Sequence, residues 1–342
     1  MSKTTFATNN ALTKKIWDEE LFQDVQIESF FASRFMGEGM NSLVQVKTQL
    51  TKQQGDQITF GIRSLLTGDG VTSGQILEGN EEALQTYDYS VSLEQYRHGV
   101  RDRGAMDRQR AMFSIDDEAR EALKIWGAEK IDKLLTAAVL ASPTKTLYRD
   151  STGTFAGSSS QSTAKAALDS NNSKLTPAFI SALRTWAKTG GGGQTYRIRP
   201  VKIDGKEMYV LLVNPCILYD LRIDATFQVA MKDAQNRGSD NPLFKSAVAI
   251  WDDVVIHESE RVPMFTDGGG ATVAGSHGVL MGAQALVWAW GKRPETKQET
   301  FDYGNEHGYA WEMIAKAGKP KYNSKDYGVV GVTLAGTNII SA

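Results

Sequence analysis

Residues 86–94 of the sequence read TYDYSVSLE, and this stretch decides the fold. Its apolar side chains occupy every second position, which places them on one face of a β-strand and the polar side chains on the other. Residues 57–63, QITFGIR, repeat the alternation with Ile58, Phe60 and Ile62. We expect these two stretches to be the strands of one long, hairpin-like arm.

The connection between the two strands, residues 64–85, is unusually long and contains Gly68, Gly70, Gly74 and Gly79. A connection of this length without its own secondary structure is uncommon inside a compact domain. Its glycines also raise the entropic cost of ordering it. The segment is therefore expected to project as a long arm away from the body of the protein.

The composition of the chain excludes several classes of protein. Its 342 residues include 38 Lys and Arg against 40 Asp and Glu, a formal net charge of −2, whereas a dedicated nucleic-acid-binding protein has a clear basic excess. No run approaches the roughly 20 apolar residues of a membrane helix, and the polar start MSKTTFATNN lacks the apolar segment of a signal peptide. A single cysteine, Cys216, excludes an intrachain disulfide. We expect a folded, non-membrane protein made in the cytoplasm.

The strongest helical pattern covers residues 114–141. Ser114 and Asp117 resemble a capping box. Acidic residues crowd the first turn, where their negative charge interacts favourably with the positive end of the helix dipole. At 1.5 Å per residue this helix is a rod of roughly 40 Å. Its apolar stripe is expected at Ile115, Ala119, Leu123, Trp126, Leu134 and Ala138.

The second half of the chain mixes helices and strands in the manner of an α+β fold. A helix is expected over 176–189, and another starts at Asn214 as N-cap and Pro215 as first residue. The continuous apolar run 209–213 is typical of a central strand covered on both faces. Strands are expected at 197–203 and 206–213 around an Asp204-Gly205 turn, and at 253–257, 278–289, 308–316 and 328–334.

The sequence contains no recognisable catalytic constellation, because the phosphate-binding loop, the nucleophile elbow and the zinc-protease helix motif are all missing. His257 is interpreted as a strand-end residue and Asp252-Asp253 as a turn, since adjacent strand residues point to opposite faces. Cys216 has no base positioned beside it by any motif. We expect no catalytic, cofactor-binding or metal-binding residues and no enzymatic activity; a soluble α+β hydrolase using His257 or Asp253 is the alternative from another class.

Two clusters of charge have two interpretations each. One cluster has a local positive excess over residues 97–110, and the other lies at 316–326. Either they are solvated faces with local ion pairs, or they form intersubunit salt bridges and a surface that weakly faces DNA. The charged residues are Arg97, Arg101, Arg103, Arg108 and Arg110 with Asp102 and Asp107, and Lys316, Lys319, Lys321 and Lys325 with Asp326.

Seven short motifs, in order along nearly the whole chain, carry a resemblance to a known family. They are FATNNALTKKIWDEELF at 6–22, RHGVRDRG at 97–104, RIRPV at 197–201, VNPCILYDLRID at 213–224, NPLF at 241–244, FDYGNEHG at 301–308 and KYNSKDYGVV at 321–330. With these motifs the sequence resembles the major capsid proteins of tailed bacteriophages, in a podovirus-associated branch of the shell fold shared with herpesviruses.

The resemblance implies a division of the chain into parts with separate roles. It implies an N-terminal arm at 1–43, an extended loop at 44–96, a peripheral domain from 97–173 and 301–342 with the spine helix 114–141, and an axial domain at 174–300. The extended loop is expected to reach over a neighbouring subunit. Intersubunit contacts are expected at Ile58, Phe60, Gly68, Gly70, Tyr87, Tyr89, Arg97, Arg101 and Arg103.

The function implied is structural: self-assembly through hexamers and pentamers into the icosahedral shell that encloses a double-stranded DNA genome. The expected partners are other copies of the chain, a portal, a separate scaffolding protein, a possible decoration protein and packaged DNA held by weak contacts, with no membrane. The expected location is the virion capsid after synthesis in the bacterial host cytoplasm. A nanocompartment shell that encloses a cargo enzyme is the alternative with the same fold.

Overall fold

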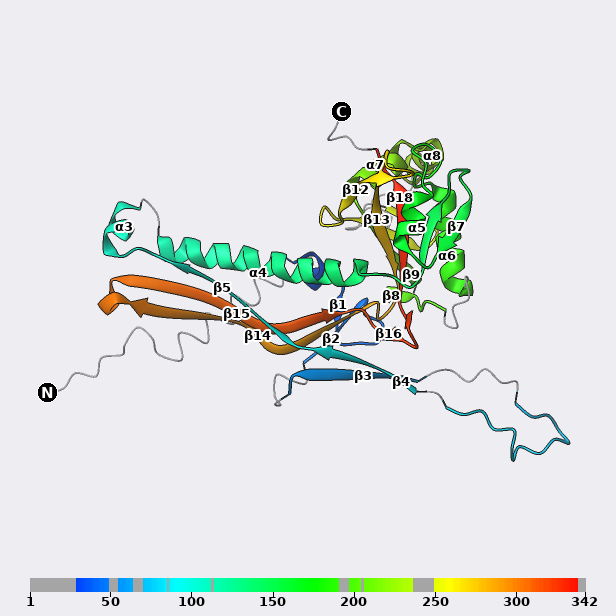
Figure 1. The fold of residues 1–342 in the computed structure, drawn as a ribbon, viewed down its shortest axis with the longest axis horizontal. Helices are drawn as coiled ribbons and strands as arrows, with labels where there is room; N and C mark the ends of the chain where they lie inside the picture. The colour runs from blue at the N-terminus through cyan, green and yellow to red at the C-terminus, as the bar shows by residue number, and fades with distance from the viewer. Residues whose placement is uncertain are drawn as a thin grey trace.

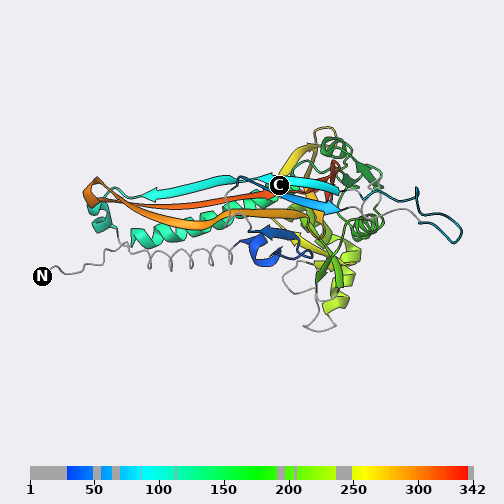
Figure 2. The same cartoon turned by 90° about the horizontal axis from the view of Figure 1, so that it is seen from below.

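The protein, as described by a computed structural model, has three parts (Figure 1). A rounded body lies at one end, a long limb leaves it, and a hairpin beside the limb points its loop in the opposite direction (Figure 2). The residues described are 29–48, 55–63, 70–84, 86–111, 114–190, 197–203, 206–235 and 249–337. Most of the expected N-terminal arm, Gly68, the motif NPLF and the Asp204-Gly205 turn lie outside these residues.

The limb is built on a five-stranded sheet in the order β1-β2-β14-β15-β5. Its strands are β1 (Met36–Gly37), β2 (Val44–Lys47), β14 (Leu286–Phe301), β15 (Glu306–Gly318) and β5 (Glu94–Arg101). β14 and β15 form a long antiparallel hairpin closed by the short 3₁₀ element η3 (Asp302–Gly304). Three segments far apart in the sequence therefore share one sheet.

One long helix, α4 (Ile115–Leu140), lies along a face of the limb sheet (Figure 1), and it confirms the helix expected over 114–141. The Ser114 hydroxyl accepts a hydrogen bond from the backbone N–H of Asp117 at 3.4 Å, as a capping residue does. Gly127 allows helix and sheet to approach closely, since a Cβ there would lie 3.1 Å from the ring of Trp311 on β15.

The buried face of α4 differs from the expected stripe. Leu134, Ala138 and Trp126 are only partly buried, because a line of residues spaced four apart faces the sheet instead. Trp126 stacks on His98 at 4.7 Å between ring centroids and meets Trp311 edge-on at 5.1 Å. The fully buried positions of α4 include Ala119, Leu123, Gly127, Ile131, Leu135 and Val139.

The body contains a second sheet whose main path is β10-β11-β9-β13-β18-β6-β7, with β8 and β12 at its margins. Its strands are β6 (Thr146–Arg149), β7 (Phe155–Ser158), β8 (Val201–Ile203), β9 (Lys206–Val213), β10 (Ala249–Trp251), β11 (Val254–Glu258), β12 (Met264–Gly268), β13 (Val273–Met281) and β18 (Val329–Ala335). Its helices are α5 (Gln161–Ala166), α6 (Pro177–Thr189), α7 (Pro215–Ile223) and α8 (Ala225–Gln235).

Strand β9 confirms the central, doubly covered strand expected at 209–213. It pairs in parallel with β11 and antiparallel with β13. Val210 and Leu212 belong to the core shared with α4, whereas Tyr209, Leu211 and Val213 belong to the core under α6 and α7. Alternate side chains of one strand thus join the two hydrophobic cores of the molecule.

In the body, helix α7 begins at the residues predicted from the sequence. The side chain of Asn214 accepts a hydrogen bond from the N–H of Cys216 at 2.9 Å, and Pro215 is the first residue of α7. The single strand expected at 278–289 is divided between β13 and β14. The chain turns at 282–285, where Gly282 lies so close to Arg199 that a Cβ would meet its carbonyl oxygen at 2.4 Å.

The strand pairing groups the segments differently from the expected division. β2 and the start of β5 belong to the limb sheet, so the projecting arm is shorter than 44–96. Residues 286–300, expected in the axial domain, pair with β15 along the limb. β6, β7 and β18, expected in the peripheral domain, belong to the body sheet, where β18 pairs with both β13 and β6 and is buried throughout.

The hairpin is a two-stranded sheet in which β3 (Gln57–Arg63) pairs antiparallel with β4 (Thr86–Ser92). Its register places Phe60 opposite Tyr89 and Arg63 opposite Thr86. The remaining short elements are α2 (Phe30–Arg34), α3 (Ala105–Arg110), β16 (Lys321–Tyr322) and β17 (Lys325–Asp326).

We predict that Leu135→Ala destabilises the unassembled subunit by about 2–5 kcal/mol, because Leu135 is fully buried between α4 and the sheet. Ile125→Ala on the same helix is the control and should cost less than about 1 kcal/mol, since Ile125 is 45% exposed. Urea unfolding followed by circular dichroism measures both. Equal losses would mean that α4 does not pack on the sheet through this face.

Candidate assembly surfaces

The loop that joins β3 to β4 is the most exposed described segment of the chain (Figure 1). Gly70, Gly74 and Gly79 adopt φ values of +71°, +99° and +87°, in the left-handed region that favours glycine. Ile76, Leu77 and Leu84 are 73%, 58% and 55% exposed. Large apolar side chains gathered on one projecting segment are typical of a surface that another molecule covers.

The base of the hairpin packs against the limb sheet of its own chain. Ile58 and Phe60, expected in an intersubunit contact, are buried with Val91 against Val287 and Ala289 of β14. The alternation of β3 therefore faces this chain's own limb sheet.

The other hairpin residues expected in contacts keep some exposure. Tyr87 and Tyr89 are partly buried and Gly70 is exposed. Burial raises the pKa of the Tyr89 hydroxyl, which lies beside Gly318. These three residues therefore remain candidates for a contact between subunits.

Two of the three arginines expected in intersubunit contacts form ion pairs within the chain. Arg97 pairs with Glu312 at 3.5 Å, and Arg101 pairs with Glu306. Arg103 is exposed and has no ion-pair partner among the residues that the structure describes. The interpretation of cluster 97–110 as local ion pairs therefore holds for Arg97 and Arg101, and Arg103 remains available.

A buried carboxylate organises the middle of the limb. Glu312 on β15 accepts hydrogen bonds from Lys292 at 2.7 Å and Lys297 at 2.9 Å. These two ammonium groups lower the pKa of Glu312 to about 2, although burial opposes the shift. Sequence analysis missed this cluster, because its members are scattered over two strands and come together only through the β14–β15 register.

The distal tip of the limb is held by a second buried carboxylate. Asp102 accepts a hydrogen bond from the backbone N–H of His307 and pairs with Arg108. Burial alone would raise the pKa of Asp102, but these two partners outweigh it and hold the pKa below the ordinary value. The tip ends at Tyr303, a fully exposed residue with a left-handed φ of +52°.

A third buried carboxylate ties the N-terminal segment to the limb. Asp132 on α4 accepts hydrogen bonds from the Ser29 hydroxyl at 2.7 Å and from the N–H groups of Phe30 and Phe31 at 2.9 and 3.1 Å. Arg261 lies 3.6 Å away and balances the charge. The signal available in the sequence was an aspartate on the apolar face of α4.

Cluster 316–326 is largely structural. Lys319 and Asp326 form a buried ion pair at 3.4 Å, and Lys319 also donates to the carbonyl of Ala141. Lys316 pairs with Glu94 at 2.5 Å on the limb. The interpretation as local ion pairs therefore accounts for these residues.

The residues of the hydrolase alternative have structural roles. His257 is 6% exposed and lies edge-on to the rings of Phe30 and Phe35. Asp252 and Asp253 form the expected turn, both with positive φ, and pair with Arg184.

Among the residues that the structure describes, no group of three or more His, Cys, Asp or Glu side chains is arranged to hold a metal ion. No described helix has the length and apolar character needed to cross a membrane.

A rigid limb, a projecting hairpin with exposed apolar side chains and ionic groups used for internal bracing define a structural subunit of a larger assembly. The phage capsid protein family model matches residues 5–341. The chain therefore belongs to the phage capsid protein family, which confirms the resemblance drawn from its motifs and its expected shell-forming function.

Individual relatives agree with this assignment over nearly their whole length. The major capsid protein of Pseudomonas phage KPP25 is 29% identical in an alignment of 373 positions that covers 97% of each protein. The solved capsid of Ralstonia phage GP4 matches with a TM-score of 0.76 at 27% identity, covering 99% of each chain. The Cyanophage Pam1 capsid asymmetric unit shares the fold, with a TM-score of 0.77 at 20% identity and coverage of 98% and 99%.

We predict that the Glu312 cluster makes the stability of the subunit sensitive to acid. The folded-state pKa of Glu312, about 2, lies below the unfolded value of roughly 4.3. The ionised carboxylate therefore contributes fully to the free energy of unfolding at pH values above the unfolded pKa. This contribution is lost as the pH falls from about 4.5 toward 2. Glu312→Gln should cost about 1–3 kcal/mol at pH 7 and flatten the dependence over this window. Urea unfolding at several pH values measures this.

The control for this prediction is Glu129→Gln, which removes an exposed pair with Lys133. It should change stability by less than about 0.5 kcal/mol and leave the acid dependence intact. An acid dependence that is the same in Glu312→Gln and in the wild type would contradict the role assigned to the cluster.

Proposed function

We propose that this chain is the repeating major capsid subunit that self-assembles, through hexamers and pentamers, into an icosahedral shell around a double-stranded DNA genome. The observation that carries the proposal is the hairpin loop, 70–84, which extends beyond the body with three large apolar side chains exposed. Such a segment gains stability when a neighbouring copy covers it. The match along 99% of the capsid chain of Ralstonia phage GP4 supports the same function.

The parts of the fold suggest a division of work in the shell. We propose that the body is the axial part at the centre of each capsomer and that the limb is the peripheral part, with the hairpin reaching over the next subunit. In this proposal the body sheet and its helices pack around the capsomer centre, and the limb extends outward from it. Contacts with neighbours are proposed at Gly70, Tyr87, Tyr89 and Arg103, while Arg97 and Arg101 brace the limb and are proposed to contribute at its surface.

The remaining partners follow from this role. We propose that the subunit meets a portal, a separate scaffolding protein and possible decoration proteins, contacts packaged DNA weakly, and works by assembly rather than catalysis. It would be made in the cytoplasm of the bacterial host and end in the virion capsid. The near-neutral balance of 38 basic and 40 acidic residues supports weak contact with DNA.

We predict that a subunit with residues 64–85 replaced by Asn-Gly folds and stays soluble but forms no closed shells. Arg63 pairs directly with Thr86, so a two-residue turn suits the hairpin. Loss of the loop removes a contact that symmetric assembly repeats in every copy. Sedimentation under assembly conditions, with circular dichroism of the unassembled subunit, measures both properties.

The matched control carries Thr72→Ala and Ser73→Ala in the same loop, which keeps its length and its apolar side chains. This variant should assemble like the wild type. Shells of normal size from the shortened protein would contradict the proposed role of the hairpin, and an unfolded shortened subunit would mean that the loop belongs to the subunit's own core.

A further inference from the structure

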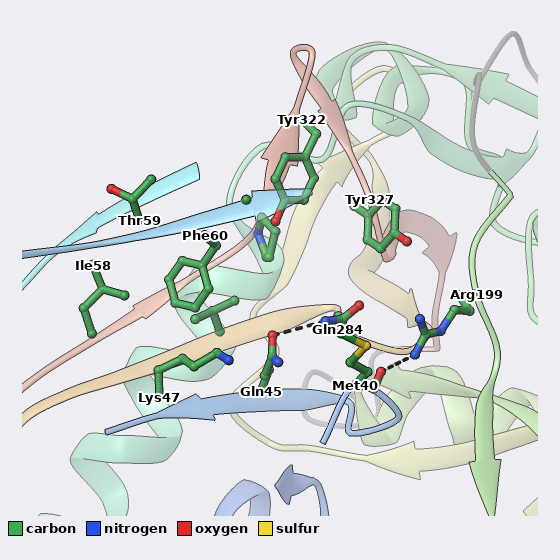
Figure 3. A pocket seen from close by; sticks show the side chains of 13 residues that line it. Met40, Gln45, Lys47, Ile58, Thr59, Phe60, Arg199, Gln284, Tyr322 and Tyr327 are labelled. Atoms are coloured by element: carbon green, nitrogen blue, oxygen red, sulfur yellow. Dashed lines mark hydrogen bonds between the residues drawn. The ribbon is translucent and has the colours of Figure 1, made fainter. Parts of the chain in front are cut away.

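A cavity of about 360 Å³ lies at the base of the hairpin, between β3, β2 and the start of β14 (Figure 3). Apolar and aromatic side chains line part of it, namely Ile58, Phe60, Val287, Tyr322 and Tyr327, and polar side chains, among them Gln45, Thr59 and Gln284, line the rest. Met40, which is mostly exposed, also lines it. Because Ile58, Phe60, Val287 and Tyr322 are themselves buried, the apolar lining reaches solvent mainly at Met40.

The charged groups of this cavity are all positive. Lys47 and Arg199 line it, and none of the described lining residues is an Asp or Glu. Among the described residues, the hydrogen bonds that Arg199 donates go to neutral groups, the carbonyl of Met40 (Figure 3) and the side chain of Asn41. Lys47 has no ion-pair partner within the described part of the chain. Two cations beside an apolar wall favour an occupant that combines carboxylates with apolar side chains.

The loop segment 76–84, ILEGNEEAL, has this combination. It contains three carboxylates, Glu78, Glu81 and Glu82, and no Lys or Arg. The same segment exposes Ile76, Leu77 and Leu84. In sign of charge and in apolar character it complements the cavity.

In the structure the segment does not lie in the cavity of its own chain. The loop follows the end of β3 and points away from the limb, whereas the cavity lies at the side of the strands (Figures 1 and 3). Residues 57–63 and 86–92 are paired along their whole length, so the loop leaves the hairpin at the end where Arg63 pairs with Thr86. A neighbouring copy can present its loop to the cavity with both hairpins unchanged.

We propose that the cavity at the base of each hairpin receives side chains from residues 76–84 of a second copy, with carboxylates of that segment beside Lys47 and Arg199. This inference rests on the proposed function, since it names the place on the neighbour where the hairpin loop binds. Repeated from copy to copy, a head-to-tail contact of this kind closes into rings when the rotation between copies allows it.

Cysteine crosslinking in assembled particles tests the contact. In a Cys216→Ser background, Leu77→Cys and Met40→Cys should form disulfides between copies on oxidation, seen as a ladder of covalent oligomers without reductant. Leu77→Cys with Tyr303→Cys is the matched control and should give no ladder, because Tyr303 lies at the distal tip. Shells in which only the control pair is crosslinked, or neither pair, would overturn the inference and leave the proposed function standing.

A charge exchange supplies the second measurement and decides the case if the cysteine pair blocks assembly. Lys47→Glu alone should lower the yield of closed shells about tenfold, and adding Glu78→Lys should restore most of it. Lys206→Glu, an exposed charge reversal on β9, is the control and should assemble normally. Lack of rescue with a normal Lys206→Glu variant would overturn the inference; lack of shells from the wild type would instead overturn the proposed function.

Discussion

The pairing of β14 with β15 is the constraint on which the rest of the structure depends. β14 begins at Leu286, in the core that the body shares with α4, and runs to the far end of the limb with two shifts of register against β15. β15 returns along β14, so that β2 can pair with β14, β5 can pair with β15, and α4 can pack on the face of the resulting sheet. The hairpin is attached to the same strand, through Val287 and Ala289. The limb and the attachment of the hairpin therefore both depend on this one pair of strands.

Local features of the fold were predictable where neighbouring residues decide the outcome. The cap at Ser114, the start of α7 at Asn214 and Pro215, and the buried strand at 209–213 depend on short-range geometry and on burial of adjacent side chains. The division of the chain into parts was less predictable. β18 joins the body rather than the limb because its strand partners are distant in sequence, 48–60 residues away in β13 and 185 residues away in β6, and no local pattern encodes that choice.

The candidate contact surface was predictable in place but not in detail. The alternation in 57–63 and 86–92 indicates a hairpin, but it does not say what covers the apolar face. For Ile58 and Phe60 the cover is the chain's own β14. The buried carboxylates Glu312 and Asp132 were missed for a related reason, and Asp102, named in cluster 97–110, was not predicted to be buried. A carboxylate is recognised as structural only when its distant partners are known.

The helix fixed along the limb sheet has a mechanical consequence. Two layers in close contact, as at Gly127 and Trp311, resist bending more strongly than either layer alone, so the limb behaves as a stiff beam. Strain imposed on the molecule then concentrates where the beam ends, at the junctions with the body and with the hairpin. Bending of the molecule is therefore expected at these two junctions rather than within the limb.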